Sequence, residues 1–212
     1  MIRKNYSLII SITFWILMLG GFSDNWLTDI KQETNYMPKF IVHGILSFSW
    51  FSILVIQTGL INFKKPKIHM RLGIIGMLVF YLMVISVIYI HLYPYEFDEA
   101  QLIMINSAKV QMIFGVILVT IGFLNRLKNN EKHRSYILFG AFCLMQPSID
   151  RFTGNFFVEM NLFGLADMIP WLLIYMTLFL SYILYNKKVT WYMIVWFFVW
   201  VYFLYQLIKY YN

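Results

Sequence analysis

The sequence predicts an all-α polytopic membrane protein, a seven-transmembrane-helix bundle that forms a single domain over residues 1–212. Of the 212 residues, 60% are hydrophobic and only 13% are charged, whereas about 25% of residues are charged in an average soluble domain. The apolar residues also occur in blocks of about 20, the helix length that crosses a bilayer. The predicted helices cover 6–22, 39–62, 70–92, 105–125, 135–149, 163–185 and 189–210.

The individual segments differ in what they are expected to do. Segment 6–22 follows a basic start and is not closed by a small-residue cleavage site, so we expect an uncleaved first span. Segment 105–125 has a face of small and polar residues, which favours close helix packing over a ligand face; these residues are Gln111, Gly115, Leu118, Gly122 and Asn125. Segment 135–149 is short and ends at Pro147 and Asp150. Segment 189–210 is aromatic and is expected to face lipid, with Trp and Tyr at the interfaces.

Basic residues predict the orientation, because cytoplasmic loops carry an excess of Lys and Arg. With the N-terminus inside, 12 of the 17 basic residues fall on inner segments. They are Arg3, Lys4, Lys64, Lys65, Lys67, Arg71, Arg126, Lys128, Lys132, Arg134, Lys187 and Lys188. Glu131 is the one acidic residue of those segments. We therefore expect the N-terminus in the cytoplasm and the C-terminus outside.

A polar stripe follows one face of the second predicted helix. His43, Trp50 and Gln57 are spaced seven residues apart, almost two helical turns, and Ser47 lies on the same face. Polar side chains that faced lipid would lack partners, so the stripe is expected to face the bundle interior. Ser47, Trp50 and Gln57, with Arg151, are candidate lining residues of an outward-facing polar pocket.

The four histidines are expected at two levels of the membrane, with His43 and His91 near the outer face and His69 and His133 near the inner face. His69 and His91 are separated by 22 residues of helix, about 33 Å, which excludes a single four-histidine centre. Two histidines per level are typical of a di-haem b bundle, in which two imidazoles ligate each iron. Arg71 and Arg134 would then hold the haem propionates. The alternative is that His69 and His133 only bond lipid phosphates or loop backbone.

Acidic residues offer an alternative to haem on the outer side. His43, His91, Asp150 and Asp167 combine the imidazole and carboxylate ligands that bind divalent metals such as zinc. A structural interpretation is equally open, in which Asp150, Arg151 and Asp167 form an ion cluster that joins two helices.

Two segments resemble a known group of proteins. They read His43…Trp50…Gln57…His69-x-Arg71-Leu72-Gly73 and Lys132-His133-Arg134…Pro147-x-x-x-Arg151. Together these are similar to uncharacterised bacterial integral membrane proteins of the DUF2306 or cytochrome b561-like kind, over roughly residues 40 to 155. The resemblance implies a helical bundle in the membrane and no established activity.

Three functions stay open from the sequence. The first is electron transfer by a protein that binds haem b or a divalent metal. The second is binding or transport of a small ligand or ion, and the third is a structural or assembly role in a membrane complex. No catalytic residue is predicted. We expect the protein in the lipid bilayer of the cytoplasmic (inner) membrane. Its expected protein partners are other membrane subunits or a second copy of this chain, and no nucleic-acid partner is expected.

Overall fold

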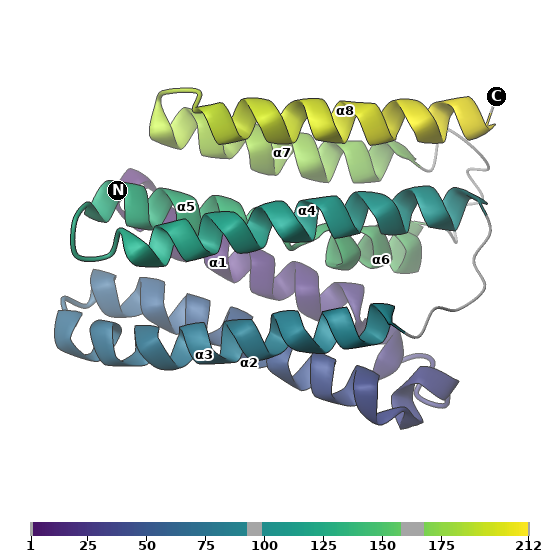
Figure 1. The fold of residues 1–212 in the computed structure, drawn as a ribbon, viewed down its shortest axis with the longest axis horizontal. Helices are drawn as coiled ribbons and strands as arrows, with labels where there is room; N and C mark the ends of the chain where they lie inside the picture. Colours follow the sequence, from purple (N-terminus) through teal and green to yellow (C-terminus); the bar gives the residue numbers. More distant parts are fainter. Residues whose placement is uncertain (1, 93–98, 158–167, 212) are drawn as a thin grey trace.

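The computed structural model describes residues 2–92, 99–157 and 168–211, and within these ranges the chain is all-helical (Figure 1). Eight α-helices occur there: α1 (Ile2–Gly21), α2 (Pro38–Asn62), α3 (Pro66–His91), α4 (Glu99–Leu124), α5 (Asn130–Cys143), α6 (Gln146–Phe157), α7 (Met168–Asn186) and α8 (Trp191–Tyr211). Two short 3-10 helices, η1 (Ser23–Asn25) and η2 (Glu33–Tyr36), lie between α1 and α2. The predicted all-α class is confirmed.

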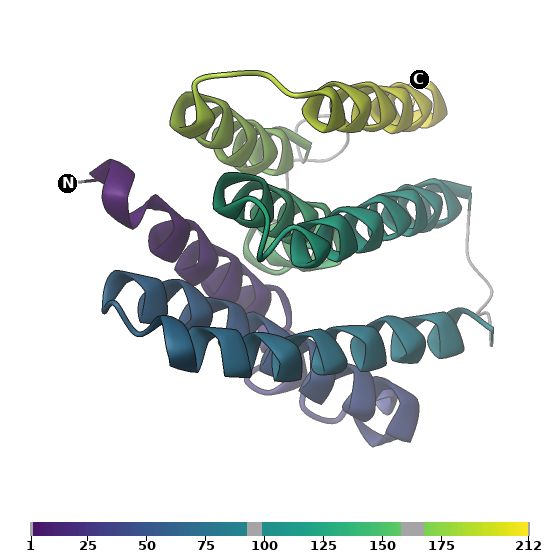
Figure 2. The same cartoon turned by 60° about the vertical axis from the view of Figure 1, so that its left-hand side comes forward.

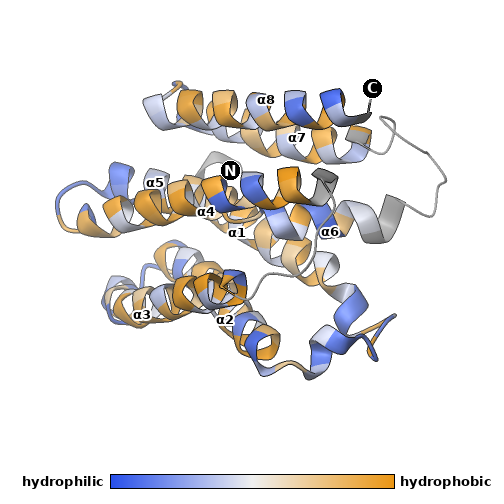
Figure 3. Ribbon diagram, turned by 45° about the vertical axis from the view of Figure 1, so that its right-hand side comes forward, coloured by the Kyte–Doolittle hydropathy of each residue, from blue (hydrophilic) through white to orange (hydrophobic). Residues whose placement is uncertain are grey.

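Five of the helices are long and apolar enough to cross a membrane. They are α2, α3, Leu102–Leu124 of α4, Ile169–Asn186 of α7 and Trp191–Tyr210 of α8. Helix α1 has a shorter apolar stretch, Asn5–Gly21. Figure 3 shows the hydrophobic residues along the long helices and hydrophilic residues around η1 and η2. The chain is therefore a multi-pass membrane protein, as its composition predicts.

The predicted helix 135–149 differs from the structure, which divides this region into α5 and α6. Helix α5 begins earlier, at Asn130, because the side chain of Asn129 accepts a hydrogen bond from the backbone N–H of Lys132. It ends at Cys143, and Pro147 explains why. A proline has no N–H and its ring clashes with the carbonyl four residues earlier, so it ends one helix and is tolerated in the first turn of the next.

The helices form three layers, with α7 and α8 on one side, α4, α5 and α6 in the middle, and α2 and α3 on the other side (Figures 1 and 2). Helices α2 and α3 pack as one hairpin and α4 and α5 as another. Helix α1 packs against α2 and α6 and also contacts α5, so it joins the two hairpins. The N-terminus and the α2–α3, α4–α5 and α7–α8 turns lie at one end of the bundle, opposite the C-terminus (Figure 1).

The α4–α5 contact is close because glycines meet there. A Cβ atom at Gly140 would lie 2.9 Å from the carbonyl oxygen of Gly115, and a Cβ at Gly115 would lie 2.9 Å from that of Gly140. A Cβ at Gly122 would also lie 3.0 Å from the backbone nitrogen of Ile137. The small residues of the fourth predicted helix therefore serve helix packing, as expected.

Candidate functional site

The structure brings two of the four histidines together. His69 lies in the first turn of α3 and His133 in the first turn of α5, and both helices begin at the end of the bundle that carries the basic turns. The centres of the two imidazole rings are 6.2 Å apart, and the ring planes are nearly perpendicular, at 78°. Both side chains are half-buried.

A backbone carbonyl holds each of these rings in place. Nδ1 of His69 is 3.2 Å from the carbonyl oxygen of Gln57, and Nδ1 of His133 is 2.8 Å from that of Gly122. A carbonyl oxygen only accepts, so Nδ1 carries the proton and donates in both rings. The unprotonated nitrogen of the neutral imidazole is then Nε2, which is the arrangement typical of metal-ligating histidines.

Gln57 connects the polar stripe of α2 to this pair. Its side-chain amide donates to the carbonyl oxygen of His69 at 3.0 Å. Its Oε1 atom is buried and has no hydrogen-bond partner among the residues that the structure describes. Trp50 is also buried, against Phe51 and Phe80. The stripe therefore faces the bundle interior, next to α3, as predicted.

At the other end of the stripe, His43 contacts two serine hydroxyl groups. Nδ1 of His43 is 2.9 Å from Oγ of Ser86, and its Nε2 is 3.4 Å from Oγ of Ser47, so both ring nitrogens are in contact with hydroxyl groups. His91 is exposed, and its Nδ1 donates to the carbonyl oxygen of Val87 on its own helix. His43 and His91 lie close enough for an electrostatic interaction, and the expected outer haem pair stays a prediction.

The alternative metal site is not assembled in the part of the chain that the structure describes. Across the described ranges, no three His, Cys, Asp or Glu side chains form a group that could hold a metal ion. Asp150 accepts a hydrogen bond from Nε1 of Trp171. Asp167 lies outside the described residues.

The three arginines named from the sequence have different surroundings in the structure. Arg151 lies 3.4 Å from Asp24 and 3.1 Å from the side-chain oxygen of Asn25, both on η1, so it is not paired with Asp150. The guanidinium group of Arg134 lies over the ring of Tyr185, 4.9 Å from its centre. Arg71 is exposed on α3. The expected pairing of Arg151 with Asp150 is therefore not seen, because Arg151 bridges to η1 instead, and the part of the expected ion cluster that involves Asp167 stays a prediction.

One ion pair lies at the histidine end of the bundle, at the surface. Nζ of Lys188 donates to a carboxylate oxygen of Glu131 at 3.1 Å, and both side chains are exposed. The hydrogen bond from Lys188, followed by its positive charge, lowers the pKa of Glu131 below its usual value.

A second polar cluster joins α4, α6 and α8, reaches α7 through the bond of Trp171 to Asp150, and was not expected from the sequence. Nε2 of Gln111 donates to Oε1 of Gln146, which also accepts from Oγ of Ser107 at 3.0 Å. Nε1 of Trp196 donates to Oε1 of Gln111 at 3.0 Å. Gln146 is four residues before Asp150 on α6, and its side chain is hydrogen-bonded to the Asp150 carboxyl group. The spacing of Gln146 and Asp150 on one helix face was the available signal.

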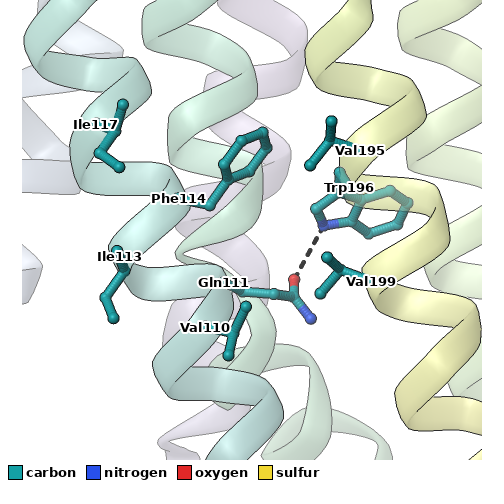
Figure 4. A pocket seen from close by; sticks show the side chains of 8 residues that line it. All are labelled: Val110, Gln111, Ile113, Phe114, Ile117, Val195, Trp196 and Val199. Carbon is teal, nitrogen blue, oxygen red and sulfur yellow. Dashed lines mark hydrogen bonds between the residues drawn. The ribbon is translucent and has the colours of Figure 1, made fainter.

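A small apolar pocket of about 190 Å³ lies beside this cluster, between α4 and α8 (Figure 4). Aliphatic and aromatic side chains line it, and Gln111 and Trp196 are its polar members. The amide of Gln111 and the indole N–H of Trp196 bond to each other, as the dashed line in Figure 4 shows. The pocket therefore offers mainly apolar contact.

Comparison with known proteins finds no family model, curated protein or solved structure that matches the chain. The resemblance to cytochrome b561-like proteins stays a prediction.

Proposed function

We propose that the protein is an electron-transfer protein of the cytoplasmic membrane that binds one haem b through His69 and His133. The observation that carries the proposal is the pairing of these two rings, 6.2 Å apart, with each Nδ1 bonded to a backbone carbonyl. Nitrogen–metal bonds of about 2 Å separate two imidazole centres on opposite sides of one metal ion by about 6 Å. The observed separation fits that arrangement.

Haem fits the donor set better than a metal ion bound by side chains alone. Protein sites for zinc have at least three side-chain ligands, and the described residues contain no group of three. Haem iron needs only two axial ligands from the protein when both are histidines. Because both ring nitrogens of His43 contact serine hydroxyl groups, we propose one haem rather than the expected two.

Residues of the chain would orient the two imidazole ligands and would provide positive charge for the haem propionates. Gln57 and Gly122 fix the two imidazole rings through their carbonyl oxygens. The positive charge of the basic residues in the neighbouring turns would favour binding of the propionate groups. Arg71 is more available for this than Arg134, because Arg134 contacts the ring of Tyr185. Bound haem would supply reversible one-electron chemistry at this level of the membrane.

We further propose seven spans, with the N-terminus inside and the C-terminus outside. Helix α1 and the α5–α6 pair add two crossings to the five long apolar helices. The basic turns gather at one end of the bundle, which supports a single orientation under the positive-inside rule (Figure 1).

An absorption spectrum of the detergent-purified protein, oxidised and reduced, tests the proposal. We expect a Soret band that shifts on reduction and that is lost in His69→Ala and in His133→Ala. His91→Ala is the matched control, because that exposed histidine bonds only to its own helix in the structure, and its spectrum should equal that of the wild type. If the wild-type protein shows no Soret band after expression with excess haem, the proposal that it binds haem b is refuted.

A further inference from the structure

The apolar pocket between α4 and α8 lies inside two candidate membrane spans, Leu102–Leu124 and Trp191–Tyr210. It extends along α4 from Val110 to Ile117, about 10 Å of helix. Val110, Ile113 and Ile117 line the pocket and are also exposed, so it is open to the lipid that surrounds the spans (Figure 4). Its two polar members bond to each other. The chemistry of the pocket therefore suits a hydrocarbon chain.

A positive charge lies one helical turn from this pocket. Lys109 precedes Ile113 by four residues, so the two side chains are neighbours on the surface of α4. Lys109 is half-buried and lies seven residues inside the span that begins at Leu102, a depth of about 10 Å. Within residues 2–92, 99–157 and 168–211, no ion pair or hydrogen bond of its side chain occurs. An ionisable residue at membrane depth is costly without a partner, so Lys109 offers a place for an anion.

Polar groups gather at one end of the pocket. The N-terminal end of α4 and the C-terminal end of α8 lie at the same end of the bundle (Figure 1). Side chains of a helix point towards its N-terminus, so the ammonium group of Lys109 extends towards the membrane surface at that end. Asn106 lies four residues before Val110, and Tyr202 lies three residues after Val199, so both continue the walls of the pocket in this direction. Asn106 and Tyr202 are exposed.

We propose that Lys109, Asn106 and the α4–α8 pocket form a binding site for an anionic phospholipid. The ammonium group of Lys109 and the side-chain amide of Asn106 donate to the phosphate group, and one acyl chain lies in the pocket. The order along the helices, with polar groups near the membrane surface and the apolar pocket deeper, is the order of headgroup and chain in one leaflet of a bilayer.

The charge of Lys109 favours one class of headgroup. Phosphatidylglycerol has a net negative charge, whereas phosphatidylcholine neutralises its phosphate with a cation of its own. We therefore expect the site to prefer phosphatidylglycerol. The site lies away from the histidine pair, at the opposite end of the bundle, so it does not depend on the binding of haem.

Native mass spectrometry of the full-length protein in detergent, titrated with phosphatidylglycerol or phosphatidylcholine, tests the headgroup contact. We expect tighter binding of phosphatidylglycerol. A lysine near a membrane surface contributes about 1 kcal/mol to the attraction of anionic lipid, so Lys109→Gln should weaken the binding of phosphatidylglycerol about fivefold and leave that of phosphatidylcholine unchanged. Lys209→Gln is the matched control, because Lys209 is an exposed lysine of α8 at the same end of the bundle. Equal affinities of Lys109→Gln and the wild type for phosphatidylglycerol would overturn the proposal.

A second pair of variants tests the acyl-chain contact and keeps the proposal testable if Lys109→Gln does not fold. Val199→Phe fills the pocket and should reduce the binding of both lipids, while Val201→Phe, at an exposed residue of α8 outside the pocket lining, should bind them as the wild type does. Unchanged lipid binding by Val199→Phe would overturn the proposal. Glycerol 3-phosphate, which has the phosphate but no chains, should not displace phosphatidylglycerol, and displacement would show a site for free anions instead.

Discussion

Replacing Gly140 by alanine tests how tightly α4 and α5 are held together. A Cβ at this position would lie 2.7 Å from Cγ2 of Val119, 2.9 Å from the carbonyl oxygen of Gly115 and 3.0 Å from the backbone nitrogen of Val119. Ordinary contact begins at 3.4 Å, so the carbonyl oxygen must retreat by 0.5 Å, the difference between 3.4 and 2.9 Å. Val119 is fully buried and, being β-branched, has one preferred rotamer in a helix. The backbone of α4 must therefore move to make room for the added Cβ.

The expected cost follows from two opposing effects. Overpacking of a dense core costs about 1–3 kcal/mol. Alanine recovers up to about 1 kcal/mol through its higher helix propensity than glycine. Three atoms lie within 3.0 Å of the added Cβ, so the upper part of the overpacking range, about 2–3 kcal/mol, applies. After the gain in helix propensity of about 1 kcal/mol, we expect Gly140→Ala to lower the free energy of unfolding by about 1–2 kcal/mol. Moving α4 also displaces the Gly122 carbonyl that orients His133, so the spectrum of any bound haem should change.

Reversible unfolding in mixed micelles, followed by circular dichroism, measures this cost. Gly44→Ala is the matched control, because a Cβ at Gly44 has no atom within 4 Å in the structure. That variant should be as stable as the wild type or slightly more stable. A Gly140→Ala protein that is as stable as Gly44→Ala would refute the close α4–α5 contact.

Two further predictions concern hydrogen bonds. Trp196→Phe leaves the buried Oε1 of Gln111 without its donor and should cost about 1–3 kcal/mol, whereas Trp191→Phe, at a residue 52% exposed, should cost far less in the same unfolding assay. Lys188→Ala should raise the pKa of Glu131 towards its usual value, measured by NMR titration. Because the folded-state pKa of Glu131 is lowered, its contribution to stability is present above the unfolded-state pKa and is lost as the pH falls through the folded-state value. If the pKa of Glu131 does not change in Lys188→Ala, the hydrogen bond between Lys188 and Glu131 is contradicted.

Hydropathy and residue spacing were sufficient to predict the long helices of this fold and the buried face of α2. The long apolar segments became helices, and the seven-residue spacing of Trp50 and Gln57 placed both on the buried face of α2. The glycine spacing in α4 indicated close packing, which Gly115 and Gly140 show.

Contacts between distant elements could not be derived in this way. The sequence suggests His69 and His133 as neighbours only through the topology, and it does not show that Ser86 and Ser47 contact both nitrogens of His43. Arg151 was expected beside Asp150 because both follow the short fifth predicted helix at the outer side of the membrane. Successive residues on a helix point in different directions, and Arg151 reaches η1 instead.

Side-chain contacts link α3 of one hairpin to the α4–α5 hairpin. The hydroxyl groups of Tyr81 and Thr120 lie 2.9 Å apart, and the rings of His69 and His133 lie at one end of the bundle. A ligand that bridges the two rings would therefore hold the two hairpins together at this end of the bundle, in addition to α1, which contacts both of them.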